Sequence, residues 1–194
     1  MARPRIYDED AVIDKALWVF WKKGFSDTSS RDLIAITGMS NGSLFNSFGD
    51  KAKLYLACLQ KYNATYIAAM ESLLISELPF KEKIQKVFEG AAKKVSATDD
   101  YEGCFFFNSS VDTGIHDAAI SALTAAIQLR LEKAFCTATD QAKKQKQLQI
   151  NSDSIQIAQY LMMITTGLRA MAKSNTPIEK IDRVINSALK FLPF

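Results

Sequence analysis

The chain has little of the chemistry on which enzymes and metal proteins depend. Its 194 residues include one histidine, His116, and three cysteines without close spacing, Cys58, Cys104 and Cys136. A structural zinc site needs clustered cysteine and histidine ligands, and three dispersed cysteines do not make a disulfide framework. The sequence also has no glycine-rich phosphate loop and no base placed beside a nucleophile. It therefore predicts no metal, no cofactor and no enzymatic activity.

Long apolar runs are also missing. No run approaches the ~20 residues that cross a membrane, and the opening MARPRIYDED lacks the apolar segment of a secretory signal. Hydrophobic residues nevertheless make up 48% of the chain, which is enough for a buried core. We therefore expect a cytoplasmic protein without a membrane partner, long enough for a small module and one further domain.

A large excess of positive charge is absent as well. The formal net charge is +3, and the first 62 residues hold nine Lys or Arg against seven Asp or Glu. Overall charge therefore does not indicate a nucleic-acid partner, and the positions of individual cations carry more information.

Apolar residues recur at helical spacing along most of the chain, and no segment alternates convincingly as a strand. Helices are expected over 8–23, twice within 28–47, and over 50–76, 80–95, 104–113, 117–135, 152–173 and 177–191. The polar stretch 140–151 is expected to be a frayed helix end and a loop. Thr176 is expected to cap the last helix, with Pro177 at its first position. The predicted fold class is all-α, with nine helices.

The segment from Thr28 to Lys51 predicts two short helices joined by a tight turn. Thr28 or Ser29 can cap the first helix, which must end at Gly38, a residue free to adopt positive φ. Ser40 can cap the second helix.

The second short helix is too polar to be a core helix. Asn41, Ser43 and Asn46 lie on its outward face with Phe45 among them, and Leu44 can anchor its inner face. A small polar helix held rigidly by a neighbour fits the major groove of DNA. The alternative is an ordinary helical hairpin of a globular core, in which these residues only form turns and caps.

This pattern resembles the DNA-binding domain of the TetR family of bacterial regulators over residues 7–62. The matching positions are Gly24-Phe25, Thr28-Ser29, Gly38-Met39-Ser40, Gly42-Ser43-Leu44-Phe45-Asn46-Ser47-Phe48 and Lys51. Two positions depart from the family pattern: Asn41 replaces a frequent basic residue, and Phe45 replaces a frequent tyrosine. The resemblance implies an N-terminal helix-turn-helix domain, residues 1–50. A connector helix from about residue 50 would lead into an effector-binding and dimerisation domain, residues 51–194.

The resemblance also implies a double-stranded, palindromic operator as the partner. Cationic side chains are expected to contact the phosphates of this operator, and the outward face of the second short helix is expected to contact its base edges. The predicted DNA-binding residues are Arg3, Arg5, Thr28, Ser29, Arg31, Ser40, Asn41, Gly42, Ser43, Phe45, Asn46 and Lys51.

Aromatic and methionine residues of the second domain predict an effector site. In the family, helices of this domain enclose a pocket, and an apolar or aromatic small molecule would suit these side chains. The predicted effector-binding residues are Tyr66, Met70, Phe88, Tyr101, Cys104, Phe105, Phe107, His116 and Met162. The alternative is that these side chains fill a solid core.

Cys104 is the sharper candidate for sensing. It follows Gly103 at an expected helix start, where backbone N–H groups favour the reactive thiolate. Gly-Cys at this place resembles a TetR subgroup that includes repressors responding to electrophiles and oxidants. The alternative is a buried and inert cysteine.

The last two expected helices each carry an apolar stripe. In TetR-like proteins they pair with their copies across a two-fold axis, which makes a four-helix bundle and a homodimer. The predicted interface residues are Leu161, Leu168, Ile181, Ile185, Ala188 and Leu189. The alternative is that both are core helices of a monomer.

The sequence thus predicts a ligand-responsive, DNA-binding transcriptional regulator. The expected activity is repression, relieved by a small apolar or electrophilic effector. The alternatives are a helical adaptor that does not bind DNA and a small thiol-dependent enzyme.

Overall fold

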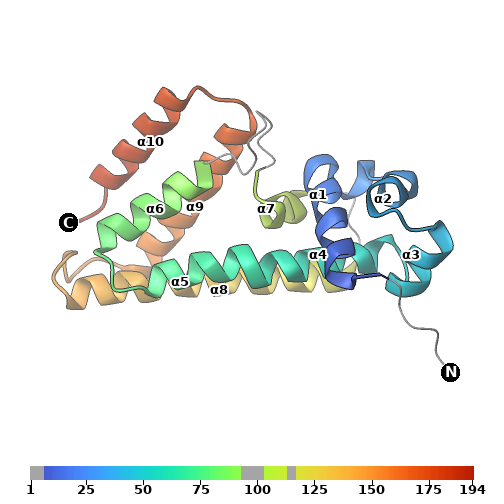
Figure 1. Ribbon diagram of the computed structural model, residues 1–194. Helices are drawn as coiled ribbons and strands as arrows, with labels where there is room; N and C mark the ends of the chain where they lie inside the picture. The colour runs from blue at the N-terminus through green and yellow to red at the C-terminus, as the bar shows by residue number, and fades with distance from the viewer. Residues whose placement is uncertain (1–6, 93–102, 113–116) are drawn as a thin grey trace. The chain divides into compact units, whose positions relative to one another are not determined.

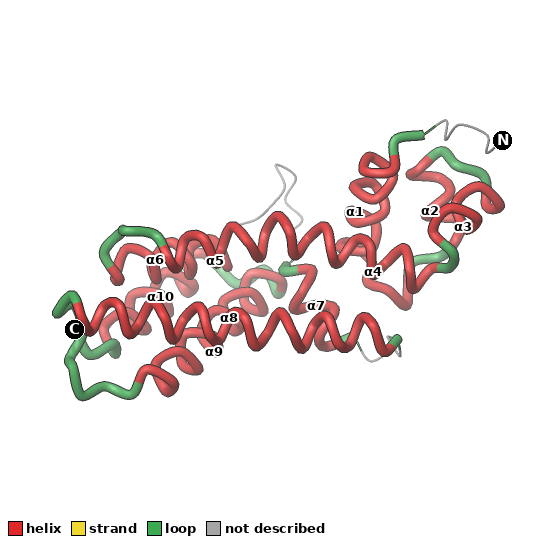
Figure 2. Tube along the Cα trace, turned by 90° about the horizontal axis from the view of Figure 1, so that it is seen from below, coloured by secondary structure: helices red, strands yellow, loops and turns green. Residues whose placement is uncertain are grey.

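A computed structural model describes residues 7–92, 103–112 and 117–194, and every regular element in these ranges is helical (Figure 1). The helices are α1 (Glu9–Asp27), α2 (Ser30–Thr37), α3 (Asn41–Phe48), α4 (Lys51–Tyr62), α5 (Ala68–Ile75), α6 (Phe80–Ala92), α7 (Phe105–Val111), α8 (Ala118–Lys144), α9 (Ser154–Lys173) and α10 (Ile178–Lys190). A π-turn, Asn63–Ile67, joins α4 and α5 into one continuous helix (Figure 2). The described ranges therefore contain nine helical stretches, which confirms the predicted all-α class. No helix in them is long and apolar enough to cross a bilayer.

Contacts divide the chain into two compact units. Unit 1 comprises Met1–Thr65 and Phe105–Thr124, and unit 2 comprises Tyr66–Cys104 and Ala125–Phe194. Both the connector helix and α8 thus continue from one unit into the other. The functional division at residue 50 stays a prediction.

Unit 1 begins with helices whose ends are fixed by side-chain caps. The Asp8 carboxylate accepts hydrogen bonds from the backbone of Asp10 and Ala11, at 3.0 and 3.3 Å. The regular part of α1 ends at Gly24, whose φ of +81° lets the chain kink before α2. Ser29 and Asp32 then form a capping box at the start of α2. These local signals explain why the predicted helix boundaries in this region agree with the structure.

The core of unit 1 is aromatic. The Tyr55 ring of α4 lies 4.9 Å from Phe20 of α1 and 5.0 Å from Phe105 of α7, measured between ring centroids. The Tyr55 hydroxyl makes a buried 2.7 Å hydrogen bond with the Ser109 hydroxyl. Burial raises the pKa of Tyr55, so this hydroxyl stays protonated. Helix α7 is thereby fixed to α1 and α4.

The core of unit 2 is formed by α5, α6, α9, α10 and the C-terminal part of α8. Phe80, Phe88, Phe135 and Leu161 are among its buried residues. Lys83 is buried beside this core and its ammonium donates to the Leu74 carbonyl at 3.1 Å, near the end of α5. Burial lowers the pKa of Lys83.

Two predicted boundaries are wrong. Helix α8 continues to Lys144 instead of ending at residue 135, because Ala138 and Ala142 extend the buried face of Phe135. Helix α10 is preceded by Pro177, and no side chain caps it; the Thr176 hydroxyl instead pairs with that of Ser174 at 3.2 Å. The expected helix ends at residues 95 and 113 lie outside the described residues.

Candidate nucleic-acid interface

The α2–α3 pair is a rigid helix-turn-helix. Leu33 of α2 and Leu44 of α3 are both completely buried, and burying such a side chain contributes ~1.5–3 kcal/mol. Gly38 has φ +74° and its N–H donates to the Ile34 carbonyl at 2.9 Å, which closes α2. The Ser40 hydroxyl accepts from the Ser43 backbone at 3.2 Å and opens α3. Two helices too short to be stable alone are therefore held in one geometry.

The face of α3 that points away from this packing is polar and exposed. Asn41, Gly42, Ser43 and Asn46 are exposed, and Phe45 is half-buried beside them. The side-chain amides of Asn41 and Asn46 can each donate and accept, as reading of a base edge requires. The Ser43 hydroxyl lies 2.9 Å from the Ser40 hydroxyl, so both also serve the helix start.

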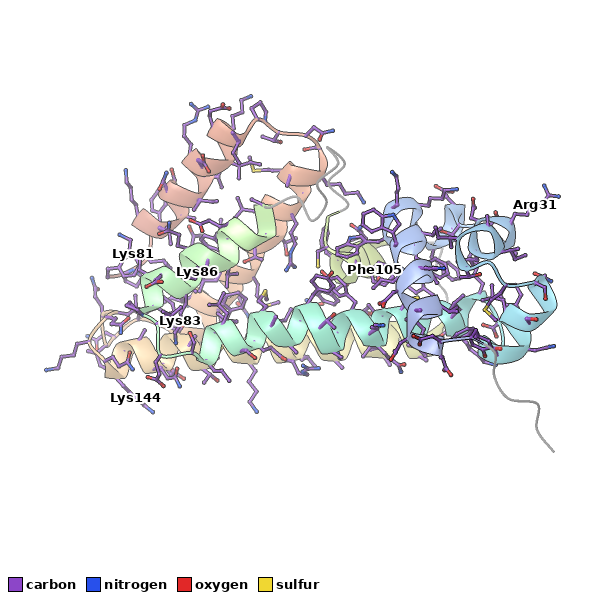
Figure 3. All side chains as sticks on the ribbon, in the orientation of Figure 1. Arg31, Lys81, Lys83, Lys86, Phe105 and Lys144 are labelled. Atoms are coloured by element: carbon purple, nitrogen blue, oxygen red, sulfur yellow. The ribbon has the colours of Figure 1, made fainter. Side chains whose placement is uncertain are left out.

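The cations of this region differ in how they are held. Arg31 of α2 is exposed and extends away from the bundle (Figure 3). The Lys51 ammonium lies 4.5 Å from the centre of the Phe25 ring. Lys23 is bound to Asp32 at 2.6 Å, and this contact, followed by hydrogen bonds from Ser29, lowers the pKa of the Asp32 carboxyl. Among the described residues, Arg31 and Lys51 are thus the predicted phosphate ligands that form no ion pair.

Thr28 has a structural role in place of the predicted DNA contact. Its side chain is 1% exposed and its hydroxyl donates to the Gly24 carbonyl at 2.6 Å. A hydroxyl in this position closes the end of α1 and cannot reach a phosphate. Ser29 is exposed but donates to Asp32 at 2.7 Å. Arg3 and Arg5, like Tyr101 and His116 of the predicted effector site, lie outside the described residues.

The predicted effector residues belong to different units. Phe105 and Phe107 lie in unit 1, where Phe105 is completely buried in the aromatic core. In unit 2, Phe88 is completely buried, Met70 and Met162 pack partly buried against the core, and Tyr66 is 47% exposed. Phe88 and Phe105 are therefore core residues, and an effector site stays a prediction.

The three cysteines differ in exposure. Cys104 directly precedes α7 and is buried, at 4% exposed. Cys58 is also buried, and burial raises the pKa of its thiol. Cys136 is only half-buried, and burial together with the nearby acids Glu132, Asp140 and Asp153 raises its thiol pKa.

The predicted dimer-interface residues pack inside the subunit. Each of the six, Leu161, Leu168, Ile181, Ile185, Ala188 and Leu189, is at most 6% exposed in the single chain. The surface available to a partner is instead formed by partly exposed residues of α9 and α10. We call it the α9–α10 face; it surrounds a shallow cavity of about 470 Å³ and includes Tyr160, Ile164, Met171, Val184 and Phe191.

Sequence reasoning missed three residues beside the interface. Ser109 and Asp112 of the α7 region make polar contacts with α4 and with the start of the α1–α2 connection. In the sequence Phe25 is recognisable only as a motif position, although its ring faces Lys51. These contacts join residues 54, 87 and 26 positions apart, and no local pattern indicates contacts at such separations, so periodicity could not find them.

Comparison with known proteins agrees with this geometry. Residues 12–58, which include the helix-turn-helix, match the model for bacterial regulatory proteins of the tetR family. The helix-turn-helix region of the chain is thus of the TetR-family type. Members of this family are DNA-binding transcriptional regulators and not enzymes.

Similarity to individual transcriptional regulators extends over nearly the whole chain. The transcriptional repressor ComR of Escherichia coli is 26% identical, over 98% of this chain and 91% of its own. The uncharacterised regulator YezE of Bacillus subtilis is 25% identical, over 99% of this chain and all of its own. A solved structure of a cysteine mutant of the TetR family regulator CifR, bound to double-strand operator DNA, is 22% identical. Its TM-score is 0.82, over 99% of this chain and all of its own.

Proposed function

We propose that this TetR-family chain is a homodimeric repressor that a small effector releases from a palindromic operator. As a DNA-binding regulator it would act in the cytoplasm, beside the bacterial chromosome. Repression is supported by the relatives ComR and BdcR, which are both transcriptional repressors of E. coli. The observation that supports this proposal most directly is the exposed polar face of α3, on a helix-turn-helix that Leu33 and Leu44 hold in place.

A homodimer would supply two recognition helices to one operator. Helix-turn-helix dimers place them in successive major grooves, about 34 Å apart. The α9–α10 face supports this proposal because it is apolar and partly exposed. A two-fold interface brings the same patch of both subunits together, which would cover this face.

An effector would act by binding one conformation of the dimer better than the other. The connector helix runs from unit 1 into unit 2, and so does α8. Both are continuous routes by which a change in unit 2 could reach the DNA-reading helices. We infer a small, mostly apolar effector, because apolar side chains dominate unit 2.

Replacement of Lys51 by alanine tests the phosphate contacts. We expect weaker binding to all duplexes and a slope of log affinity against log salt that is shallower by ~0.9 per lost contact, hence ~1.8 in a dimer. Titrations followed by fluorescence anisotropy at several salt concentrations measure this slope. Lys144→Ala, at an exposed lysine of unit 2, is the matched control (Figure 3). An unaltered slope for the Lys51 variant would show that this lysine touches no phosphate.

Cys104→Ser tests whether the effector is an electrophile. N-ethylmaleimide is expected to lower the operator affinity of the wild type and to leave that of the variant unchanged. Cys104 is buried whereas Cys136 is half-buried, so faster labelling of Cys104 would require higher reactivity or local opening. Mass spectrometry of partly labelled protein gives the order in which the cysteines react with N-ethylmaleimide. An equal response of variant and wild type would exclude sensing through Cys104.

A further inference from the structure

Phe25 lies where the end of α1 meets the end of α7. It directly follows Gly24, the kink at the end of regular α1, and its ring lies against the core of unit 1. The ring packs edge-on to Tyr55 at 5.2 Å and stacks with Phe20 at 6.4 Å. Its position is thus fixed from one side by the aromatic core.

The backbone of Phe25 is held from α7. Its N–H donates to one carboxylate oxygen of Asp112 at 3.2 Å, and the Ser26 hydroxyl lies 3.5 Å from the other. Asp112 directly follows α7, whose Ser109 is itself bonded to Tyr55. A hydrogen bond to a charged acceptor is stronger than one between neutral groups. Asp112 therefore fixes the chain at the point where α1 gives way to α2.

The free face of the Phe25 ring carries the Lys51 ammonium, 4.5 Å from the ring centre. An ammonium at this distance is attracted by the negative face of the ring. The neighbouring lysine of the same helical turn, Lys53, lies 3.6 Å from Asp50 instead. The Lys51 ammonium is thus held by an uncharged ring and not by a carboxylate, so its positive charge remains available to bind an anion.

We infer that Phe25 is a positioning residue for DNA binding: its ring, held in place by Asp112, orients the Lys51 ammonium toward a backbone phosphate. This inference rests on the proposed contact between Lys51 and DNA. A lysine side chain loses rotamer freedom when it is ordered. A ring that orders it beforehand reduces that cost at the moment of binding. The end of α7 thereby acts on a DNA contact through three successive groups, namely the Asp112 carboxylate, Phe25 and Lys51.

A double-mutant cycle tests this role. The variants are Phe25→Leu, Lys51→Gln and their combination, measured on the duplex that the wild type selects from a randomised library. Phe25→Leu is expected to weaken binding about two- to five-fold per recognition helix in the wild-type background. It should have no further effect in the Lys51→Gln background, because the ring then has no cation to orient. Phe25→Tyr, which keeps the ring face, should bind like the wild type.

Asp112→Asn extends the cycle to α7. It should weaken binding less than Phe25→Leu, and only while Lys51 is present. Ser110→Ala, at an exposed residue of the same helix, is the matched control and should bind normally. If Phe25→Leu costs the same affinity in both backgrounds, the residue is merely structural and the inference is wrong. If Lys51→Gln alone leaves the operator affinity unchanged, the proposed contact between Lys51 and a phosphate, on which the inference rests, is wrong.

A spectroscopic measurement covers the case in which Phe25→Leu does not fold. In the wild type, the ring should shift the NMR signals of the Lys51 ε-methylene protons upfield, and Asp112→Ala should reduce that shift. Unshifted Lys51 signals in the wild type would overturn the inference without any variant.

Discussion

Glutamate at both Ile164 and Val184 is expected to give a folded monomer that no longer binds its operator. Both side chains are half-buried on the α9–α10 face, so charges there are tolerated in a free subunit. In a dimer they would be buried without partners, at a cost of several kcal/mol. Because specific binding is typically at least 10³-fold tighter than non-specific binding, a loss of about 10³-fold or more is expected. Sedimentation and anisotropy titrations measure the two effects.

Two variants of α10 serve as controls for this prediction. Asn186→Glu places the same charge on an exposed residue that does not line the cavity, and it should remain dimeric. Ile185→Glu charges a residue of the subunit core, and it should unfold the protein. A double variant of Ile164 and Val184 that still sediments as a dimer would place the interface elsewhere.

Asn46→Ala is expected to relax operator specificity at one base pair of each half-site. Asn46 is exposed on α3, and an asparagine amide can pair with both N6 and N7 of adenine. A lost contact of this kind costs ~1–3 kcal/mol and acts in both half-sites of a dimer. Selection from a randomised duplex library compares the preferred sequences of the variant and the wild type.

The control for this experiment is Gln60→Ala, which removes an exposed amide from α4, outside the predicted interface. It should select the same operator as the wild type. If the Asn46 variant also selects an unchanged operator, base recognition must come from other residues of α3.

The parts of the fold that were predicted correctly are those that local chemistry specifies. Ser29 with Asp32, Gly38, and Ser40 fix the ends of α2 and α3 through neighbours a few residues away. A single sequence displays such signals directly. The exposed polar face of α3 follows equally from its residue pattern.

The parts that were missed depend on what covers a surface. Periodicity shows that one side of α9 and α10 is apolar, but not whether the subunit or a partner buries it. In the structure the strongest stripe, including Leu161 and Leu189, faces the subunit core. In the sequence alone, a hydroxyl such as that of Thr28 is likewise compatible with a helix cap and with a DNA contact, and only its burial distinguishes the two. Contacts of Ser109 and Asp112 depend on tertiary packing alone.

The π-turn between α4 and α5 gives this chain a place where its length is adjustable. A π-turn contains one more residue than the α-helical turn it replaces. Removal of one residue between Asn63 and Thr65 would let an ordinary α-helix close. The residues on either side would keep their facing, so Lys61 would still reach Asp14 on α1 and Leu74 would stay in the core of unit 2. Deletion of one residue here would therefore carry little penalty for either core.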